Sequence, residues 1–457
     1  MDKLISTNPG NNYIKLGEVN ISTASEIKQK VTQANNTKTK WKNFGIKKRI
    51  EFLKSIYDEF VKRKEELAIL IMKETGKPIQ QTIREAKWYT EGFQWFLDNA
   101  EQSLKDEITF KDSSSINKIV YEPMGVAAVI TPWNFPFGMA VWGIVPNLLA
   151  GNTVVFKTSE ESPLVGKFIE KVFLNHNLPK GVFAEVYGAG DVGKTLVENN
   201  INLIWFTGST FVGKFLYKTA AEKFIKVLLE MGGSNPCVVF EDVDVKIAAE
   251  LVYASRFQNC GQVCNAIKRL IVHKSIADSV TNELKKILTS KILGDPKDEK
   301  TDIGTLVAKR QVDLLKGQVD DALEKGAKIL YQKEIPNNLK GAYYPPTLLG
   351  NITKDMRVWK EEVFGPVLPI MTFATEQEAV DFANDTLYGL GSRVISNDKK
   401  RAERVASQIE AGTVEINKGD RWLLCNPFGG YKNSGMGREH GAIGFQELCQ
   451  IKVISTG

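Results

Sequence analysis

The sequence predicts an α/β protein built around parallel β-sheet, because short apolar runs alternate with segments long enough for helices. Four of these runs have the length of buried strands and are apolar apart from Thr153 and Glu185; they are residues 153–156, 183–187, 203–206 and 237–240. The intervals between the runs can hold the crossover helices that parallel strands require. Such an alternation favours a sheet covered by helices on both faces.

Length, charge and cysteine content narrow the class of protein. The 457 residues are too many for one hydrophobic core, so two or three domains are expected. The 60 Lys and Arg residues against 54 Asp and Glu residues leave a net charge of only +6, so no nucleic-acid partner is expected. The five cysteines are sparse and odd in number, and the first nine residues lack the apolar core of a signal peptide. Reduced thiols in the cytoplasm are therefore expected.

Apolar spacing predicts a long helix in the N-terminal part of the chain. Apolar residues recur near helical spacing from Ile50 to Ile71, and Gly-Lys-Pro at 76–78 supplies a stop signal. The uncharged stretch 125–156 has the length of a membrane span, but prolines and asparagines divide it into short pieces. It is predicted to be a buried strand, a loop, a helix and a strand, so no membrane partner is expected.

The second half of the chain continues the alternation. Residues 269–273 and 327–331 are predicted strands, and residues 312–325 are a predicted helix. The tail, residues 444–454, ends in the period-two alternation of a strand. A terminal strand is an exposed sheet edge unless another sheet covers it.

A glycine-rich turn at residues 188–195 satisfies two nucleotide-binding patterns at once. It fits both GxGxxG and GxxxxGK[ST]. As a P-loop it would place Lys194 on phosphate and Thr195 on magnesium, which makes a nucleotide hydrolase the rival function. One loop cannot serve both patterns, and no strand-terminal aspartate follows in the order that a P-loop enzyme needs. A tight turn that closes a strand–helix joint is the favoured interpretation.

A second turn, residues 206–213, again lies between a predicted strand and a predicted helix. Gly208 would let the backbone approach a pyrophosphate, because glycine adds no side chain there. The following helix N-terminus would offer unpaired N–H groups to an anion. This turn is the better candidate for a dinucleotide site.

Two further segments, residues 229–236 and 257–264, carry candidate catalytic groups. Cys264 lies in a Gly/Gln/Asn-rich turn after an amphipathic helix, which suggests a thiolate nucleophile. Glu230 lies on a Gly-Gly turn, which suggests a general base. The alternatives are an inert buried cysteine, a Cys260–Cys264 redox or metal pair, and a solvated glutamate at the end of a helix. The three histidines lie far apart without ligand spacing, so no metal site and no Cys–His dyad is expected.

These two segments closely resemble the signature motifs of the aldehyde dehydrogenase superfamily, and the resemblance covers nearly the whole chain in family order. The other matching segments are residues 131–136, 151–157, 206–209, 361–367 and 427–439. The resemblance implies an α/β fold of three parts: a Rossmann-like NAD(P)-binding domain, a catalytic α/β domain and a small β oligomerisation element. Their expected ranges are 1–106 with 122–232, 233–433, and 107–121 with 434–457.

The resemblance also implies assembly as a homodimer or a homotetramer. Residues 108–110 and 118–121 would form the ribbon that, in this family, reaches a neighbouring subunit. The alternative is that the tail pairs within its own chain.

The chemistry implied by the resemblance is NAD(P)-dependent oxidation of an aldehyde to the free acid. Cys264 would attack the carbonyl, and the amide of Asn134 would help to hold the oxyanion of the thiohemiacetal. After hydride transfer to the nicotinamide, Glu230 would activate the water that hydrolyses the thioester. Acylating relatives pass the thioester to coenzyme A and generally lack this glutamate, so Glu230 favours the non-acylating branch.

The implied cofactor is NAD or NADP. A carboxylate at Glu160 can accept hydrogen bonds from a ribose hydroxyl and would repel a 2′-phosphate, which favours NAD. The implied cofactor residues are Thr131, Pro132, Trp133, Lys157, Ser159, Glu160, Gly190, Phe206, Gly208, Ser209, Val212, Met231, Glu362 and Phe364.

The aldehyde substrate is left open by the sequence. The implied tunnel residues, which could also be ordinary core, are Phe135, Met139, Trp142, Arg421, Trp422 and Phe428. Succinate-semialdehyde dehydrogenases usually carry an arginine where this chain has Trp142, although Arg421 could pair with a distal carboxylate instead. Asp420 together with the tryptophans could equally favour a cationic aminoaldehyde such as betaine aldehyde.

Overall fold

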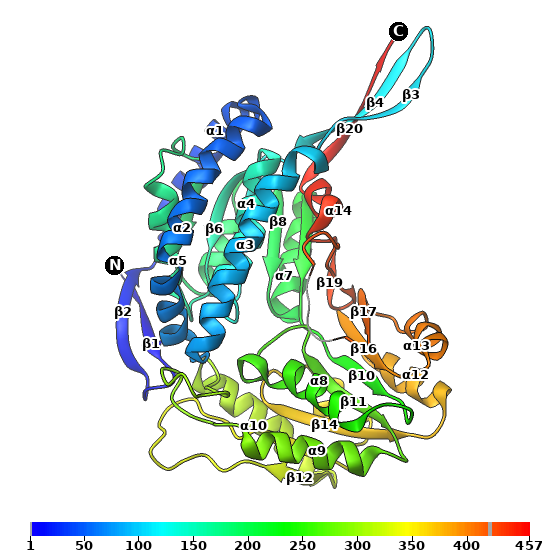
Figure 1. The fold of residues 1–457 in the computed structure, drawn as a ribbon. Helices are drawn as coiled ribbons and strands as arrows, with labels where there is room; N and C mark the ends of the chain where they lie inside the picture. The colour runs from blue at the N-terminus through cyan, green and yellow to red at the C-terminus, as the bar shows by residue number, and fades with distance from the viewer. Residues whose placement is uncertain (1, 419–422) are drawn as a thin grey trace.

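The computed structural model describes residues 2–418 and 423–457, and a six-stranded sheet organises the first half of the chain (Figure 1). The strand order is β19-β9-β8-β5-β6-β7. Strands β5 to β9 run parallel, whereas β19 pairs antiparallel with β9. The bounds are β5 (Val126–Ile130), β6 (Thr153–Lys157), β7 (Phe183–Val186), β8 (Leu203–Thr207), β9 (Lys226–Glu230) and β19 (Gly435–Met436).

Side chains of this sheet alternate between two cores. Ala127 and Val129 of β5 belong to the core beneath α2 to α5, whereas Ala128 and Ile130 belong to the core beneath α1, α6 and α7. Strand residues alternate between faces, so a strand that is apolar at every position must be covered on both sides. The predicted two-sided sheet is confirmed. The helices are α1 (Ala24–Asn43), α2 (Gly45–Thr75), α3 (Ile79–Ser103), α4 (Pro136–Ala150), α5 (Pro163–Leu174), α6 (Gly190–Glu198) and α7 (Thr210–Lys223).

The ends of the N-terminal helices follow from local sequence. Thr23 and Glu26 form a reciprocal capping box at the start of α1. Helix α2 ends at Gly76, which is left-handed with φ 72° and lies so close to Thr305 that a Cβ would come 1.8 Å from its hydroxyl oxygen. The predicted stop is therefore confirmed. Within the described ranges, no helix combines the length and the apolar content that a membrane crossing needs.

A seven-stranded sheet with its own core forms most of the second half. The order is β12-β13-β14-β11-β10-β16-β17, and every neighbouring pair is parallel except β12 with β13. The predicted strand at 237–240 belongs here, as β10, and not to the first sheet. The bounds are β10 (Asn235–Val239), β11 (Ile267–His273), β12 (Lys328–Gln332), β13 (Thr347–Gly350), β14 (Val367–Phe373), β16 (Gly391–Ile395) and β17 (Thr413–Ile416).

The remaining elements of this half surround that sheet. Helices α8, α9, α10, α12 and α13 contribute side chains to its core. The short strands β15 and β18 pair antiparallel with each other. The bounds are α8 (Val245–Phe257), the 3-10 helix η1 (Gln258–Gly261), α9 (Ala277–Ser290), α10 (Lys309–Glu324), α11 (Arg357–Lys360), α12 (Glu376–Asn384), α13 (Lys399–Ala406), β15 (Tyr388–Gly389) and β18 (Tyr431–Lys432).

A three-stranded ribbon projects away from both sheets and carries the C-terminus at its far end (Figure 1). It consists of β3 (Glu107–Lys111), β4 (Ile116–Pro123) and β20 (Cys449–Thr456), in the order β20-β4-β3. The predicted ribbon strands are confirmed, and the tail pairs within its own chain. Helix α14 (Gly441–Glu447) precedes β20, and a separate hairpin of β1 (Lys3–Asn8) and β2 (Ile14–Asn20) lies at the N-terminus.

Candidate active site

A cavity of about 930 Å³ lies at the carboxyl ends of the strands of the six-stranded sheet. Crevices at these strand ends are where parallel α/β sheets bind ligands. Every predicted site residue within the described ranges lines this cavity; Arg421 and Trp422, like Asp420, lie outside those ranges. The predicted residues in its wall are Thr131, Pro132, Trp133, Asn134, Phe135, Met139, Trp142, Lys157, Ser159, Glu160, Gly190, Phe206, Gly208, Ser209, Val212, Glu230, Met231, Cys264, Glu362, Phe364 and Phe428.

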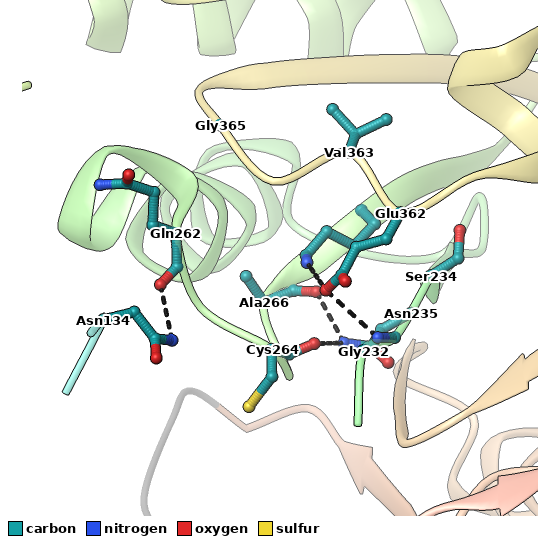
Figure 2. A network of polar contacts seen from close by, with 12 residues as sticks. Asn134, Gly232, Ser234, Asn235, Gln262, Cys264, Ala266, Glu362, Val363 and Gly365 are labelled. Atoms are coloured by element: carbon teal, nitrogen blue, oxygen red, sulfur yellow. Dashed lines mark hydrogen bonds and ion pairs between the residues drawn. The ribbon is translucent and has the colours of Figure 1, made fainter. Parts of the chain in front are cut away.

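Cys264 reaches the cavity through an unusually tight turn after α8. Asn259 and Cys260 are both left-handed, with φ 47° and 54°, and a Cβ on Gly261 would come 2.3 Å from the carbonyl oxygen of Gly365. After the turn, the side-chain amide of Asn235 donates to the carbonyl of Cys264 at 2.8 Å (Figure 2). The nucleophile candidate is therefore fixed by its backbone and not by its side chain.

Cys260 has a different environment from Cys264. It is fully buried, and its Sγ lies 3.7 Å from the carbonyl oxygen of Gly304. The two cysteines are not bonded to each other, and only Cys264 is part of the cavity wall. Among the described residues, no group of three or more His, Cys, Asp or Glu side chains could hold a metal ion. These observations favour Cys264 over Cys260 as the reactive thiol.

Asn134 is held by three hydrogen bonds, two of which join it to the cysteine turn. Its side-chain amide donates to the carbonyl of Gln262 at 3.0 Å (Figure 2). Its own carbonyl accepts from Nζ of Lys77 at 2.8 Å and from the amide of Asn259 at 3.0 Å. One N–H of the Asn134 amide is used in this way, and an amide carries two. The loop that bears Asn134 is thus anchored to the turn that presents Cys264.

Glu230 is the last residue of β9 and is buried, so the alternative of a solvated charge at a helix end is wrong. Neither carboxylate oxygen has a hydrogen-bond partner among the described residues. Burial raises the pKa of Glu230 to about 8, and Arg438 opposes this rise. A buried carboxyl group whose pKa lies near neutrality can take up a proton during a reaction.

A second buried acid, Glu439, accompanies Glu230. Its carboxylate oxygens also lack hydrogen-bond partners within the described part of the chain. Burial and the neighbouring Glu230 hold the pKa of Glu439 well above its usual range. Glu439 lines the same cavity. Residue 439 ends the family-like segment 427–439, but no role for it was predicted from the sequence.

Glu362 lies at the junction of the two sheets. Its Oε1 pairs with Nζ of Lys268 at 2.8 Å and accepts from the backbone N–H of Gly233 at 3.2 Å. The ring of Phe364 lies edge-on to Trp133, with 5.6 Å between centroids. These predicted cofactor residues therefore form one wall near Cys264, and Lys268 is a charged neighbour that sequence reasoning missed.

The opposite end of the cavity has the features of an anion site. A Cβ on Gly208 would come 2.5 Å from the ring of Phe206, so only glycine fits this turn. Ser209 caps α7, its Oγ accepting from the N–H of Val212 at 3.3 Å. The N-terminus of α7 consequently faces the cavity, where its remaining N–H groups can bind a phosphate.

Lys157 ends β6 at the same edge of the sheet. The side chain is buried, which lowers its pKa, and Nζ donates to the carbonyl of Thr158 at 3.1 Å. The nearest carboxylate oxygen of Glu160 is 3.9 Å away. A lysine and a glutamate placed together in this way can share the two hydroxyls of a ribose, because one donates hydrogen bonds and the other accepts them.

The glycine turn at 188–195 belongs to the cavity but lacks the geometry of a P-loop. Helix α6 begins at Gly190, so the turn joins a strand to a helix, as predicted. Lys194 lies on the surface, 3.9 Å from Glu198, and the hydroxyl of Thr195 donates to the carbonyl of Asp191 at 2.9 Å. A hydroxyl engaged with its own helix is not directed at a metal ion. The site therefore gives no support to the rival nucleotide hydrolase.

Aromatic rings line the part of the cavity next to α3 and α4. Trp142 lies 5.3 Å from Tyr89 and 6.0 Å from Trp88, measured between ring centroids, and Phe428 is 6.4 Å away. His440 packs edge-on against Trp142 at 4.0 Å. Met139 and Trp142 are almost completely buried, as core residues would be, yet both line the cavity.

Comparison with known proteins agrees with this geometry. The model of the aldehyde dehydrogenase family matches residues 2–454. The chain belongs to the aldehyde dehydrogenase family. It is 36% identical over 445 residues to a Staphylococcus haemolyticus protein whose name places it provisionally in that family, and the match covers 96% of this chain and 92% of the relative.

Solved aldehyde dehydrogenase structures have the same fold. The NAD-dependent aldehyde dehydrogenase from Sinorhizobium meliloti is similar with a TM-score of 0.96 and 32% identity, covering 100% of this chain and 91% of that one. Betaine aldehyde dehydrogenase from Staphylococcus aureus, in complex with NAD+, has a TM-score of 0.95, 32% identity and the same coverage. An NADP-dependent enzyme of E. coli also has a TM-score of 0.95 and 32% identity, covering 100% of this chain and 95% of that one. The neighbours thus include enzymes of both cofactor types, and this aldehyde dehydrogenase is an NAD(P)-dependent oxidoreductase.

Several residues of this aldehyde dehydrogenase site were not predicted from its sequence. Helix α3 contributes Gln81, Arg84, Glu85 and Trp88 to the cavity wall. Their spacing of three, four and seven residues places them on one face of a helix. That spacing is the available signal, but it says nothing about what the face contacts. Only the packing of α3 against the Asn134 loop makes these residues part of the site.

Proposed function

We propose that the chain oxidises an aldehyde to the free carboxylic acid, with Cys264 as nucleophile, Asn134 as oxyanion donor and Glu230 as base. The observation that carries the proposal is that these three side chains, from three separate segments, line one cavity. The cavity also contains a glycine turn at a helix N-terminus, the buried Lys157 and the Glu362 carboxylate, which together fit a dinucleotide. When bound, that cofactor supplies the hydride acceptor.

The residues of the chain divide the chemistry between them. The thiolate of Cys264 attacks the carbonyl carbon, and the developing oxyanion receives hydrogen bonds from the Asn134 amide and from the N–H of Cys264. Loss of one such donor typically costs about 3–4 kcal/mol of barrier. After loss of hydride a thioester remains on Cys264. Glu230 then takes a proton from water, the hydroxide attacks the thioester, and the acid leaves with the thiol restored.

Glu230 also supports hydrolysis over transfer to another thiol. Its oxygens have no hydrogen-bond partner among the described residues, so they are available to a water molecule in the cavity. For the cofactor we propose NAD, because the Glu160 carboxylate beside Lys157 disfavours a 2′-phosphate. Sparse cysteines, none of which forms a disulfide, support a cytoplasmic location.

The two sheets and the ribbon support the three-part organisation. We propose a cofactor domain of residues 1–106 and 122–232, a catalytic domain of 233–433, and an oligomerisation element of 107–121 and 434–457. Strand β19, within the last range, pairs with β9 of the first sheet and not with the ribbon. Glu230 is the last residue of β9 in the first sheet, and Asn235 is the first residue of β10 in the second sheet. The proposed domain boundary at residue 233 therefore separates the base from the nucleophile.

One assay separates this function from the rival nucleotide hydrolase. The wild-type enzyme should form NADH from a simple aldehyde and release no phosphate from ATP. Cys264→Ser should abolish NADH formation because a hydroxyl is a far weaker nucleophile than a thiolate. Lys194→Ala serves as the matched control and should retain the activity. Surviving activity in Cys264→Ser together with its loss in Lys194→Ala would contradict the proposal.

For the substrate, we propose an aldehyde that an aromatic wall can accept, either apolar or cationic. Support comes from the rings of Trp88, Tyr89 and Trp142, since aromatic faces attract quaternary ammonium groups. Betaine aldehyde should therefore be oxidised with a kcat/KM at least about tenfold above that of succinate semialdehyde, a preference worth roughly 1.4 kcal/mol. The reverse order would point to Arg84, which also lines the cavity, as a carboxylate partner.

A further inference from the structure

Arg256 is a buried arginine whose guanidinium group binds backbone carbonyls. It is the last residue but one of α8, and its side chain is fully buried. Nε donates to the carbonyl of Val367 at 3.0 Å. Nη2 donates to the carbonyls of Val363, at 3.0 Å, and of Gly365. Burial lowers the pKa of Arg256 to about 9, so the group is still charged near neutral pH, and these hydrogen bonds offset part of its desolvation.

The three carbonyls belong to the segment 361–367, which also carries two predicted cofactor residues. Glu362, Val363 and Gly365 follow one another along this segment (Figure 2). Glu362 precedes the first carbonyl that Arg256 binds, and Phe364 lies between the first and the second. The side chains of Glu362 and Phe364 line the cavity, whereas Arg256 does not. Arg256 therefore holds the backbone from which these two cavity side chains project.

The same segment packs directly on the turn that presents Cys264. A Cβ on Gly261 would come 2.3 Å from the carbonyl oxygen of Gly365, which is the oxygen that accepts from Arg256. Gly261 is also left-handed, with φ 76°. Glycine is thus needed here for the conformation of the turn and for the close approach of the segment. The end of α8, the cysteine turn and the segment 361–367 consequently meet at one carbonyl.

Other contacts hold the beginning of the segment. The side-chain amide of Gln318, on α10, donates to the carboxylate of Glu361 at 3.0 Å and to the carbonyl of Glu362 at 3.1 Å. Arg256 binds the part that follows, which includes Phe364. Loss of Arg256 would therefore release the middle of the segment while its first residues stay attached to α10.

The two ends of the cavity divide the proposed dinucleotide between them. Hydride leaves the carbon that is bonded to the sulfur of Cys264, so the hydride acceptor must lie at the Cys264 end. Glu362 and Phe364 are in the wall at that end, whereas Lys157 and the N-terminus of α7 are in the wall at the opposite end. In the proposed function, the segment 361–367 thus contacts the nicotinamide half of the cofactor and not the adenine half.

We propose that Arg256 is a positioning residue that sets where Glu362 and Phe364 lie relative to Cys264, and so orients the nicotinamide half of the dinucleotide. The inference rests on the proposed function, in which Cys264 is the nucleophile and NAD is the cofactor. Arginine suits this role because its planar fork presents donors in several fixed directions. A lysine offers one compact charge and cannot reach the same set of carbonyls.

Separate binding of NADH and ADP tests the proposal, because ADP carries only the adenine half. Arg256→Met should raise the Kd for NADH about tenfold, which corresponds to roughly 1.4 kcal/mol, and should leave the Kd for ADP within about twofold of wild type. Fluorescence titration measures NADH binding, and isothermal titration calorimetry measures ADP binding. Arg256→Lys keeps the charge without the fork and should show most of the same loss. It also provides the measurement if Arg256→Met does not fold.

Arg49→Met is the matched control for loss of a buried arginine. Arg49 is buried, and its guanidinium group donates to the carbonyls of Leu149 and Lys42 at 2.9 and 3.0 Å. It does not line the cavity. Both arginine variants should lower the free energy of unfolding in urea, but Arg49→Met should leave the Kd for NADH and for ADP unchanged.

A second test asks whether Arg256 acts through the two cavity side chains. In an enzyme that carries Glu362→Ala and Phe364→Ala, the side chains that Arg256 positions are absent. Arg256→Met should then raise the Kd for NADH less than about twofold, because the effects of residues that act through one another do not add. A residue that only stabilised the fold would show the same effect in both backgrounds.

Three outcomes would overturn the proposal. The first is a folded Arg256→Met or Arg256→Lys enzyme that binds NADH as tightly as the wild type. The second is equal weakening of NADH and ADP binding, which a general loss of packing would produce. The third is an undiminished effect of Arg256→Met in the Glu362→Ala and Phe364→Ala background. The proposed function fails separately, if wild-type enzyme alkylated fully at Cys264 by iodoacetamide still forms NADH.

Discussion

Burial is the common cause of the unusual side chains in this site. It raises the pKa of both Cys264 and Glu230, so near neutral pH the resting enzyme holds a protonated thiol and a largely protonated base. Arg438 and Lys268 are the cations that oppose burial at these two positions, one for each group.

Glu230→Gln should separate the two halves of the reaction. Acylation and hydride transfer come before the step that needs the base, so the variant should release about one NADH per active subunit in a burst and then turn over slowly. Stopped-flow absorbance at 340 nm measures the burst. Because the pKa of Glu230 is about 8, the steady-state rate of the wild type should rise with pH up to that value, and the variant should lose this dependence.

Coenzyme A provides the control for this experiment. The wild type should form little acyl-CoA when coenzyme A is added, since hydrolysis is activated and thiol transfer is not. Loss of both burst and steady state in Glu230→Gln would show that the residue activates the thiol instead. Abundant acyl-CoA would place the enzyme in the acylating branch.

At the scale of elements, a buried glutamate joins three parts of the cofactor half. Glu74, near the end of α2, accepts hydrogen bonds from the N–H groups of Leu164 and Val165 at 2.9 and 2.8 Å and from the hydroxyl of Ser6. It thus caps the first turn of α5 and ties it to β1. Burial nevertheless raises its pKa to about 7, and the three hydrogen bonds only partly oppose this.

Glu74→Gln should change how stability depends on pH. Between about pH 4.5 and 7 the folded state binds more protons at Glu74 than the unfolded state, so the free energy of unfolding falls as pH rises through this window, by up to about 3 kcal/mol. Glutamine does not titrate and keeps one acceptor oxygen. The variant should therefore gain stability relative to the wild type from pH 5 to pH 8 in urea denaturation at matched protein concentration. Parallel curves for the two proteins would contradict this expectation.

The elements themselves were largely predictable, and the reason is local. A run such as 203–206 is apolar at every position and too short for a typical helix, which favours a strand buried on both faces, and β8 is one. Gly76 stops α2 because only glycine readily adopts the left-handed conformation so close to Thr305. The run 237–240 does not itself indicate which sheet it joins, because that depends on its neighbours in space. The boundary at residue 233, which the family resemblance implies, separates this run from the strands of the first sheet, and β10 belongs to the second.

At the scale of the whole molecule, the site residues that lie in sequence motifs were predictable. The site residues that only long-range packing brings together were not. Cys264, Asn134 and Glu230 were found because the segments that bear them resemble the motifs of the family. Lys268 was not, since nothing in its own segment indicates that Glu362, far along the chain, lies 2.8 Å away. Long-range ion pairs leave no local signature, although they set the charge that the motif residues experience.

The outer edge of the ribbon is an exposed apolar surface that predicts assembly with a second copy of the chain. Strand β20 pairs with β4 on one side only, and at the ribbon edge Ile451 and Val453 are 66% and 63% exposed. An exposed apolar edge strand is a surface for pairing with another chain, and soluble proteins seldom leave one uncovered. We expect a homodimer, or a tetramer of two dimers, in which this edge meets a second copy. The pairing of β20 within its own chain does not conflict with this, because a strand has two edges.

Light scattering on the full chain and on a chain that ends at Gly444 should show an assembly that weakens on truncation. Because truncation also removes part of α14, the sharper variant is Ile451→Lys with Val453→Lys, which keeps β20 but charges its exposed apolar face. Gln450→Lys adds a charge to the other face of the same strand and is the matched control. A wild-type monomer of 51.0 kDa at micromolar concentration would contradict the expectation, since obligate oligomers remain associated there. Equal assembly of the double variant and the wild type would instead place the interface elsewhere on the molecule.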